Sequence, residues 1–205
     1  MSSQQHKSSE TYSLEALRSG DSNEFARVVE DNSGYIYRLA LKILHNPQDA
    51  EDVLQETFIK AYRSFANFHG RSKISTWLYR IATNEALMFL RKKKPVSISV
   101  DAPFDHVNEE QKPLQIVDWC CIPEDELASD EARRHLDQSV DDLSLNLRTV
   151  FILRDIEGLS IKETAEILDI SQSAVKTRLH RARMQLRELL SSYYREHMPA
   201  VLKID

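Results

Sequence analysis

Five Lys or Arg side chains and no acidic one occupy residues 171–187, SQSAVKTRLHRARMQLR. The whole chain nevertheless carries a formal net charge of −5. Uninterrupted positive charge on one short segment suits a polyanion, because each neutralised phosphate releases condensed counterions. A solvated basic face on a surface helix would have the same composition, so charge alone does not separate these two interpretations.

The residues around this stretch predict a helix-turn-helix. Ser160 and Glu163 form a capping box for a short helix, and Asp169 with Ile170 makes a tight connection. Ser171 can then cap a second helix. One apolar stripe of that second helix can pack on the first: Val175, Leu179, Ala182 and Leu186. Because such a motif inserts its second helix into the major groove, the motif and the charge together predict DNA binding.

A second group of candidate residues lies in DAEDVLQETFIKAYRSFANF, residues 49–68. Leu54, Phe58 and Ala61 mark the core side of the predicted helix. The opposite face carries Asp52, Gln55, Glu56, Ile59 and Arg63. An isoleucine among carboxylates suits a protein partner better than solvent, although a single exposed isoleucine usually has no function.

The third group follows directly, in FHGRSKISTWLYRIATNEALMFLRKKK, residues 68–94. A basic loop precedes a helix with Trp77, Tyr79, Arg80 and Asn84, and the helix ends in RKKK. Aromatic and basic groups beside a loop suit single-stranded DNA, whose unstacked bases expose their faces. Two alternatives remain: Trp77 belongs to the core, and RKKK complements the dipole of a helix C-terminus.

The sequence predicts that the elements that position these residues are helices. Apolar spacing of three and four residues predicts helices over residues 21–45, 48–65 and 76–93, with a loop around Gly70. Pro95, Pro103, Pro113 and Pro123 interrupt the pattern, which returns over residues 124–143, 145–158, 160–170 and 172 to about 194. The sequence therefore predicts an all-α fold with two small helical domains, a flexible acidic linker, and the helix-turn-helix in the second domain.

The predicted divisions follow the charge. Residues 1–95 carry 14 basic and 11 acidic side chains, residues 96–142 carry 3 and 13, and residues 143–205 carry 10 and 8. Two mildly basic ends thus flank an acidic middle, which is compatible with a nucleic-acid partner. We expect a partly disordered N-terminal segment at 1–20, domains at 21–94 and 123–195, a linker at 95–122 and a tail at 196–205.

Composition excludes other classes of protein. No apolar run is long enough for a transmembrane helix, and the polar first residues lack the apolar part of a secretory signal, so we expect a cytoplasmic protein. The only cysteines, Cys120 and Cys121, are adjacent and fit neither a disulfide framework nor a zinc site. With four glycines, no nucleophile motif and scattered histidines, we expect no catalytic residue, metal, cofactor or small-molecule substrate.

Three motifs in this order resemble one family. DAEDVLQETFIKAYRSF, FHGRSKISTWLYRIATNEA and GLSIKETAEILDISQSAVKTRLHRAR, on either side of an acidic linker, are similar to the extracytoplasmic-function (ECF) group of bacterial sigma-70-type RNA polymerase sigma factors. The resemblance covers roughly residues 24–190. It implies two conserved domains, region 2 and region 4, and a function in promoter recognition, DNA melting and transcription initiation.

The resemblance also implies a role for particular residues. The β′ subunit of core RNA polymerase would bind Asp52, Gln55, Glu56 and Ile59, and the β subunit is a further expected partner. The promoter minus-ten element, with a flipped base, would contact Ser64, Phe68, His69, Lys73, Arg80, Ile81 and Asn84. The duplex minus-thirty-five element would contact Ser171, Ser173, Lys176, Thr177, Arg178, His180, Arg181 and Arg183.

A further partner implied by the resemblance is an anti-sigma factor, often one bound to a membrane, that masks both contact surfaces. The main alternative from the residues is a stand-alone helix-turn-helix regulator with an N-terminal dimerisation domain. That alternative predicts operator binding without polymerase, and a dimer on a palindromic site.

Overall fold

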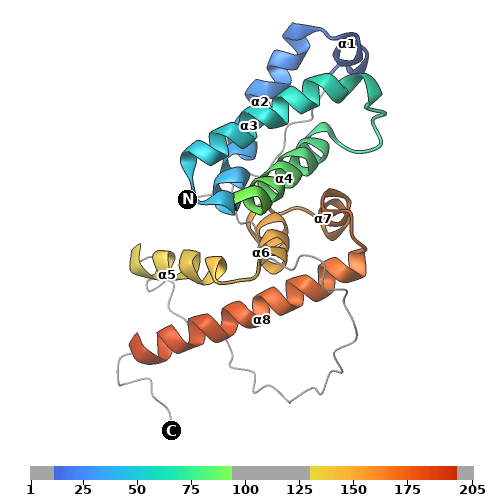
Figure 1. Cartoon of the computed structure of the whole chain (residues 1–205). Coiled ribbons are helices and arrows are strands. Elements are labelled where there is room, and N and C mark those ends of the chain that lie inside the picture. The colour runs from blue at the N-terminus through green and yellow to red at the C-terminus, as the bar shows by residue number, and fades with distance from the viewer. Residues whose placement is uncertain (1–11, 94–129, 198–205) are drawn as a thin grey trace. The chain divides into compact units, whose positions relative to one another are not determined.

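The computed structural model describes residues 12–93 and 130–197, and side chains in the second range from 134 to 191 (Figure 1). All regular elements in these ranges are helical, which confirms the all-α class. In chain order they are α1 (Leu14–Ser19), α2 (Ser22–Leu44), α3 (Pro47–Ser64), η1 (Phe65–Asn67), α4 (Ile74–Lys93), α5 (Asp130–Asp141), α6 (Leu145–Phe151), η3 (Ile152–Ile156), α7 (Ile161–Leu168) and α8 (Gln172–His197).

The chain folds as two compact units. The first comprises residues 1–95 with 152–176, and the second comprises residues 96–151 with 177–205. The predicted linker at 95–122, its flexibility and both cysteines lie outside the described residues. None of the helices described in either unit is long and apolar enough to cross a membrane.

Helices α2, α3 and α4 build the core of the first unit. Their predicted ends are close to the observed ones, because local side chains stop and start them. Asp21 caps α2 by accepting hydrogen bonds from the backbone N–H groups of Asn23 and Glu24, at 2.8 and 3.0 Å. Asn46 caps α3, in which Pro47 occupies the first turn. The side chains buried between these helices include Val28, Ile36, Leu39, Ala61, Phe65 and Leu78.

Helix α1 is a finding of the structure, since the sequence pattern predicts no helix before Asp21. Ser13 caps it, and Gly20 ends it in the left-handed conformation at φ +84°. Its six residues are too few to show helical periodicity, and only Leu17 is fully buried. Tertiary contacts, described below, hold this short helix in place.

Residues 152–176 belong to the first unit through apolar and polar contacts. Ile152, Leu153 and Ile167 are buried in the same cluster as the α2–α4 core. The carboxylate of Glu157, only 8% exposed, accepts hydrogen bonds from Lys42 at 2.6 Å and from the Tyr79 hydroxyl at 3.1 Å. Burial, together with the Glu157 charge, raises the pKa of Tyr79 far above its ordinary value, so this phenol stays a hydrogen-bond donor.

The predicted helix over 145–158 is interrupted. The α-helix ends at Phe151, the next turn is a π-helix, and Gly158 leaves it at φ +72°. In the second unit, Val140, Leu143, Ala182 and Leu186 form a buried cluster, with Leu147 and Phe151 against it. The predicted stripe on α8 is therefore buried, and Ala182 and Leu186 belong to this cluster.

Candidate nucleic-acid interface

The loop between η1 and α4 presents basic and polar side chains on an apolar base. His69, Arg71 and Lys73 are exposed, while the ring of Phe68 is only 7% exposed. Phe68 packs on Phe65 and Trp77, with ring centroids 6.0 and 4.8 Å apart. The loop thus has a buried aromatic anchor beneath an exposed cationic rim.

The burial of the aromatic side chains bears on one expectation and on one alternative from the sequence. The burial of Phe68 leaves almost none of its ring for a base, so this residue shapes the loop and does not offer a stacking surface to DNA in this conformation. Trp77 is partly buried against Phe65, with centroids 4.9 Å apart, which favours the alternative that it belongs to the core.

The remaining residues of this group lie beside the loop in sequence. Ser64 is exposed at the end of α3, Arg80 and Asn84 are exposed on α4, and Ile81 is half-buried. Arg80 approaches Asp169 at 3.9 Å, but both side chains are largely exposed, so this pair holds Arg80 only weakly. These positions leave a polar, cationic surface around an ordered loop.

The acidic face of α3 is exposed as predicted. Asp52, Gln55 and Ile59 are exposed and Glu56 is half-buried. Ile59 is 44% exposed and Tyr62, one helical turn further, is 47% exposed. The sequence reasoning missed Tyr62, although its spacing of three residues from Ile59 could have identified it. Together they make an apolar spot beside carboxylates.

Lys60 forms ion pairs beside this face of α3. Its ammonium group lies 2.7 Å from Glu85 of α4 and 3.5 Å from Glu56. The hydrogen bond to Glu85 raises the pKa of Lys60, so the lysine stays charged at neutral pH. The half-buried Glu56 thus already has a cationic partner, whereas Asp52 and Gln55 extend into solvent.

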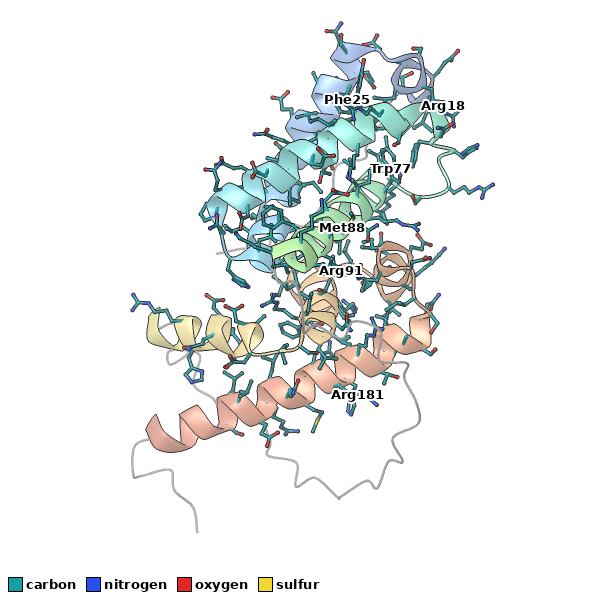
Figure 2. All side chains as sticks on the ribbon, viewed as in Figure 1. Arg18, Phe25, Trp77, Met88, Arg91 and Arg181 are labelled. Carbon is teal, nitrogen blue, oxygen red and sulfur yellow. The ribbon has the colours of Figure 1, made fainter. Side chains whose placement is uncertain are left out.

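The C-terminal end of α4 combines a basic run with an exposed methionine. Lys93 lies 2.6 Å from Asp49, in the first turn of α3, and its ammonium is 5.2 Å from the centre of the Phe89 ring. Arg91, Lys92 and Lys93 are all exposed, and Lys93 is paired with Asp49. Met88, 43% exposed, lies on the same helix as Arg91 (Figure 2). Lys94 lies outside the described residues.

The two helices of the helix-turn-helix motif are capped by residues of the motif itself. Ser160 Oγ accepts from the Glu163 N–H at 3.1 Å, and the Glu163 carboxylate accepts from the Ser160 N–H at 2.9 Å, which confirms the predicted capping box. Asp169 ends α7 at φ +54°. Ser171 Oγ then accepts from the Ala174 N–H at 3.1 Å and opens α8 as predicted.

The first turns of α8 separate an apolar stripe from a basic face. Val175, Leu179, Ala182 and Leu186 are buried. The predicted contact residues lie off this stripe, and seven are exposed: Ser171, Ser173, Lys176, Thr177, His180, Arg181 and Arg183 (Figure 2 labels Arg181). Arg178 is half-buried, and the loss of water around it lowers its pKa, though an arginine remains charged at neutral pH.

These faces can bind polyanions and protein, but they contain no metal centre. Among the described residues, no cluster of His, Cys, Asp or Glu side chains is arranged to hold a metal ion. The chemistry available is hydrogen bonding, ion pairing and apolar contact.

Two family models match the chain. The model described as Sigma-70 region 2 matches residues 28–96, and the model described as Sigma-70, region 4 matches residues 133–186. The first covers α3, α4 and α2 from residue 28 onward, and the second covers the helix-turn-helix motif. The two matches lie on opposite sides of the proline-rich segment.

Curated relatives span almost the same length. The ECF RNA polymerase sigma factor SigW of Bacillus subtilis is 40% identical over 86% of this chain and 94% of its own. The RNA polymerase sigma-H factor of Pseudomonas aeruginosa is 35% identical over 89% of this chain and 94% of its own.

Solved structures share the fold at lower identity. The sigma factor RpoE of Bartonella quintana, solved in complex with the anti-sigma factor NepR, is 23% identical, with a TM-score of 0.58 over 82% of this chain and 98% of that chain. CnrH, solved in complex with the cytosolic domain of CnrY, is also 23% identical, with a TM-score of 0.62 over 87% of this chain and 95% of that chain. On the sequence matches over both regions, the chain belongs to the ECF group of sigma-70-type RNA polymerase sigma factors.

Proposed function

We propose that this chain binds core RNA polymerase and directs it to promoters, where it reads the minus-thirty-five element as duplex and the minus-ten element as separated strands. One observation supports this most strongly. A single chain of this family carries both a helix-turn-helix with an exposed basic face and a cationic loop on an aromatic anchor. Each suits one of the two states of promoter DNA.

Polymerase docking is assigned to the exposed face of α3. Asp52, Gln55, Glu56 and Ile59 would contact the β′ subunit, and the structure adds Tyr62 as an apolar neighbour of Ile59. Exposed apolar side chains within a charged rim are typical of protein interfaces. We also expect contacts with the β subunit, to which no described residue is assigned.

Promoter melting is assigned to the loop and the polar face of α4. His69, Lys73, Arg80 and Asn84 would hold the separated strand, with Ser64 and Ile81 at the edge of the site. Unstacking a base costs a few kcal/mol, and stacking and hydrogen bonds on the protein return about 1–3 kcal/mol for each base. Strand opening then becomes favourable when several bases are captured, with no catalytic residue or cofactor of this chain.

Duplex recognition is assigned to the N-terminal half of α8. Lys176, Thr177, His180 and Arg181 would face base edges, whereas Ser171, Ser173, Arg178 and Arg183 would contact phosphates. An arginine or lysine on a guanine edge contributes about 1–3 kcal/mol of discrimination.

An anti-sigma factor is the proposed regulator. The Bartonella sigma factor is bound to one in its solved structure, and this chain shares that fold. Such a partner would cover the exposed apolar spot on α3 or the basic face of α8, and it could hold the chain at a membrane. The chain itself would act in the cytoplasm, where the polymerase is.

The test is run-off transcription with purified core polymerase on a genomic promoter library. Asp52→Arg should abolish binding to core polymerase while its circular dichroism stays unchanged, because charge reversal removes a contact without touching the core. Arg181→Ala should bind core normally but relax the preference at the minus-thirty-five element. Full-strength binding of Asp52→Arg to core would mean that the interface is misplaced. Tight binding of the isolated chain to a palindromic operator would favour the stand-alone regulator.

A further inference from the structure

Helix α1 is hydrogen-bonded to the backbone of the loop that follows η1. The guanidinium of Arg18 donates two hydrogen bonds to one acceptor, the carbonyl oxygen of Phe68, from Nε at 2.9 Å and from Nη2 at 2.8 Å. Donor and acceptor are 50 residues apart in sequence. Bonds from a charged, planar donor to one carbonyl fix both the position and the direction of that peptide group.

A second contact of α1 lies at the tip of the loop. Gly70 has φ +70°, and a Cβ atom placed there would lie 3.1 Å from Leu14 Cδ1. The left-handed backbone favours glycine at this position, and a Cβ atom would also require Leu14 to shift by a few tenths of an ångström. Helix α1 is thus hydrogen-bonded to the loop at Phe68 and lies close to it at Gly70.

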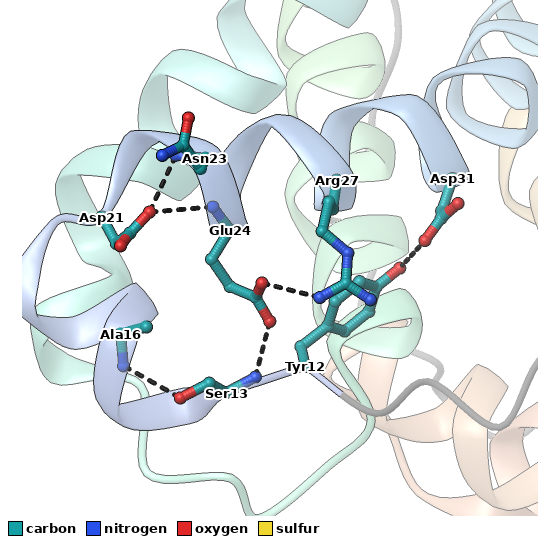
Figure 3. A network of polar contacts seen from close by, with 8 residues as sticks. All are labelled: Tyr12, Ser13, Ala16, Asp21, Asn23, Glu24, Arg27 and Asp31. Carbon is teal, nitrogen blue, oxygen red and sulfur yellow. Dashed lines mark hydrogen bonds and ion pairs between the residues drawn. The ribbon is translucent and has the colours of Figure 1, made fainter.

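The helix itself is held by polar contacts from α2 (Figure 3). Glu24 accepts a hydrogen bond from the Ser13 backbone N–H at 2.7 Å, and its other carboxylate oxygen lies 2.7 Å from Arg27. The Tyr12 hydroxyl donates to Asp31 at 2.7 Å. Because the buried Leu17 also joins the core cluster, both polar and apolar contacts hold α1 in the first unit.

The restraint falls on the backbone and leaves the tips of the loop side chains exposed. His69, Arg71 and Lys73 are exposed to solvent, whereas the buried Phe68 ring packs on Trp77. A loop ordered before binding loses less conformational entropy when it receives a ligand. The structure therefore supplies an ordered backbone with adaptable, cationic side chains.

We propose that α1 is a brace for the base-binding loop and that Arg18 is a positioning residue for recognition of the minus-ten strand. This inference rests on the proposed function of the loop. Arg18 acts through the Phe68 carbonyl and not through DNA. Its loss should lower the preference for the correct strand sequence more than the general affinity for single strands.

The test uses holoenzyme assembled from core polymerase and the full chain. The probe is a fluorescent single-stranded oligonucleotide that carries the non-template minus-ten sequence of the strongest promoter from the run-off screen, and a scrambled oligonucleotide is the reference. Arg18→Ala should reduce the cognate-to-scrambled affinity ratio about tenfold. Permanganate reactivity of minus-ten thymines in the duplex promoter should fall as well. Arg18→Lys, which keeps the charge without the planar pair of donors, should restore little of the ratio.

Arg38→Ala is the matched control, because Arg38 is an exposed arginine of the same unit and stacks on Tyr35 at 4.7 Å. It should leave the ratio unchanged, and binding of Arg18→Ala to core should equal that of the wild type. Equal losses for both oligonucleotides, with a smaller salt dependence, would show that Arg18 contacts phosphate and would overturn the proposal.

A second variant tests the dependence on the loop conformation independently of Arg18. Gly70→Ala should also reduce the ratio, because φ +70° strains an alanine and the added methyl group approaches Leu14. Suppose that the wild-type holoenzyme prefers the cognate strand but that Arg18→Ala and Gly70→Ala both leave the cognate-to-scrambled ratio unchanged. This result would refute the role of α1 as a brace and would leave the assigned function of the loop intact. A wild-type holoenzyme that shows no preference for the cognate strand would instead refute the assigned function of the loop.

Discussion

Two turns in the first unit, each beside residues that we propose contact DNA, are held in different ways. The turn between α7 and α8 is held by its own neighbours: Ser160 with Glu163, and Ser171 with Ala174. The loop between η1 and α4 is held from outside, by Arg18 at the Phe68 carbonyl and by Leu14 at Gly70. A duplex groove has a fixed shape that a locally specified helix pair can match, whereas an extruded base needs a receptacle built from several elements.

The largest expected effect is on the loop anchor. Phe68→Ala should lower the free energy of unfolding by about 3 kcal/mol, because a buried aromatic ring leaves a cavity against Phe65 and Trp77. Urea unfolding followed by circular dichroism measures this loss. Phe68→Leu is the control and should lose about 1 kcal/mol. If Phe68→Ala lowers the free energy of unfolding by no more than the removal of a helix cap does, the loop does not depend on the buried Phe68 ring.

A smaller and more local effect is expected at the helix-turn-helix. Ser160→Ala should lower the free energy of unfolding by about 1 kcal/mol, since the Glu163 N–H loses its acceptor. Hydrogen exchange should accelerate at Glu163 and not in the loop at 68–73. Ser22→Ala, an exposed serine in the first turn of α2, serves as the control because Asp21 provides that cap. Faster exchange in the loop as well would show that the two turns are coupled.

The left-handed residues of these two turns, Asp169 and Gly70, should respond in opposite directions to substitution. Asp169→Gly should raise the free energy of unfolding by about 0.5 kcal/mol, because glycine adopts φ +54° without steric cost. The exposed contact with Arg80, which this change removes, contributes little. Gly70→Ala should lower stability, since φ +70° and Leu14 both oppose a side chain. Thermal unfolding of the two variants measures both changes in stability. A higher unfolding temperature for Gly70→Ala would contradict the close approach of Leu14 to residue 70.

The smallest effect is acid weakening of α1. The hydrogen bond from the Ser13 N–H, with help from Arg27, holds the pKa of Glu24 below its ordinary value of 4.5. The carboxylate's contribution is therefore complete above about pH 4.5 and is lost as pH falls through the lower folded-state pKa. The protection factor of the Ser13 amide, which is its exchange rate corrected for the intrinsic pH dependence of exchange, should fall over that acidic range. Glu24→Gln, which does not titrate, should show no such change in protection with pH, and a wild-type protection factor that stays constant would contradict the assignment.

The sequence determined the parts of this protein whose contacts are local. The capping box at Ser160, the cap at Ser171 and the proline start of α3 all involve partners within a few residues, so spacing alone could locate them. The buried stripe and the basic face of α8 follow from a fixed helical period. The family resemblance rests on the same short motifs, and the sequence matches confirm it.

Only the tertiary structure decided which elements support the loop. Helix α1 has too few residues to show a period, and the Arg18 bond to Phe68 spans 50 residues with no pattern to announce it. The same holds for the burial of Phe68, which spacing could not distinguish from exposure on a loop, and for the exposure of Tyr62. Contacts between distant segments form when the chain packs, and a one-dimensional pattern carries no record of which segments meet.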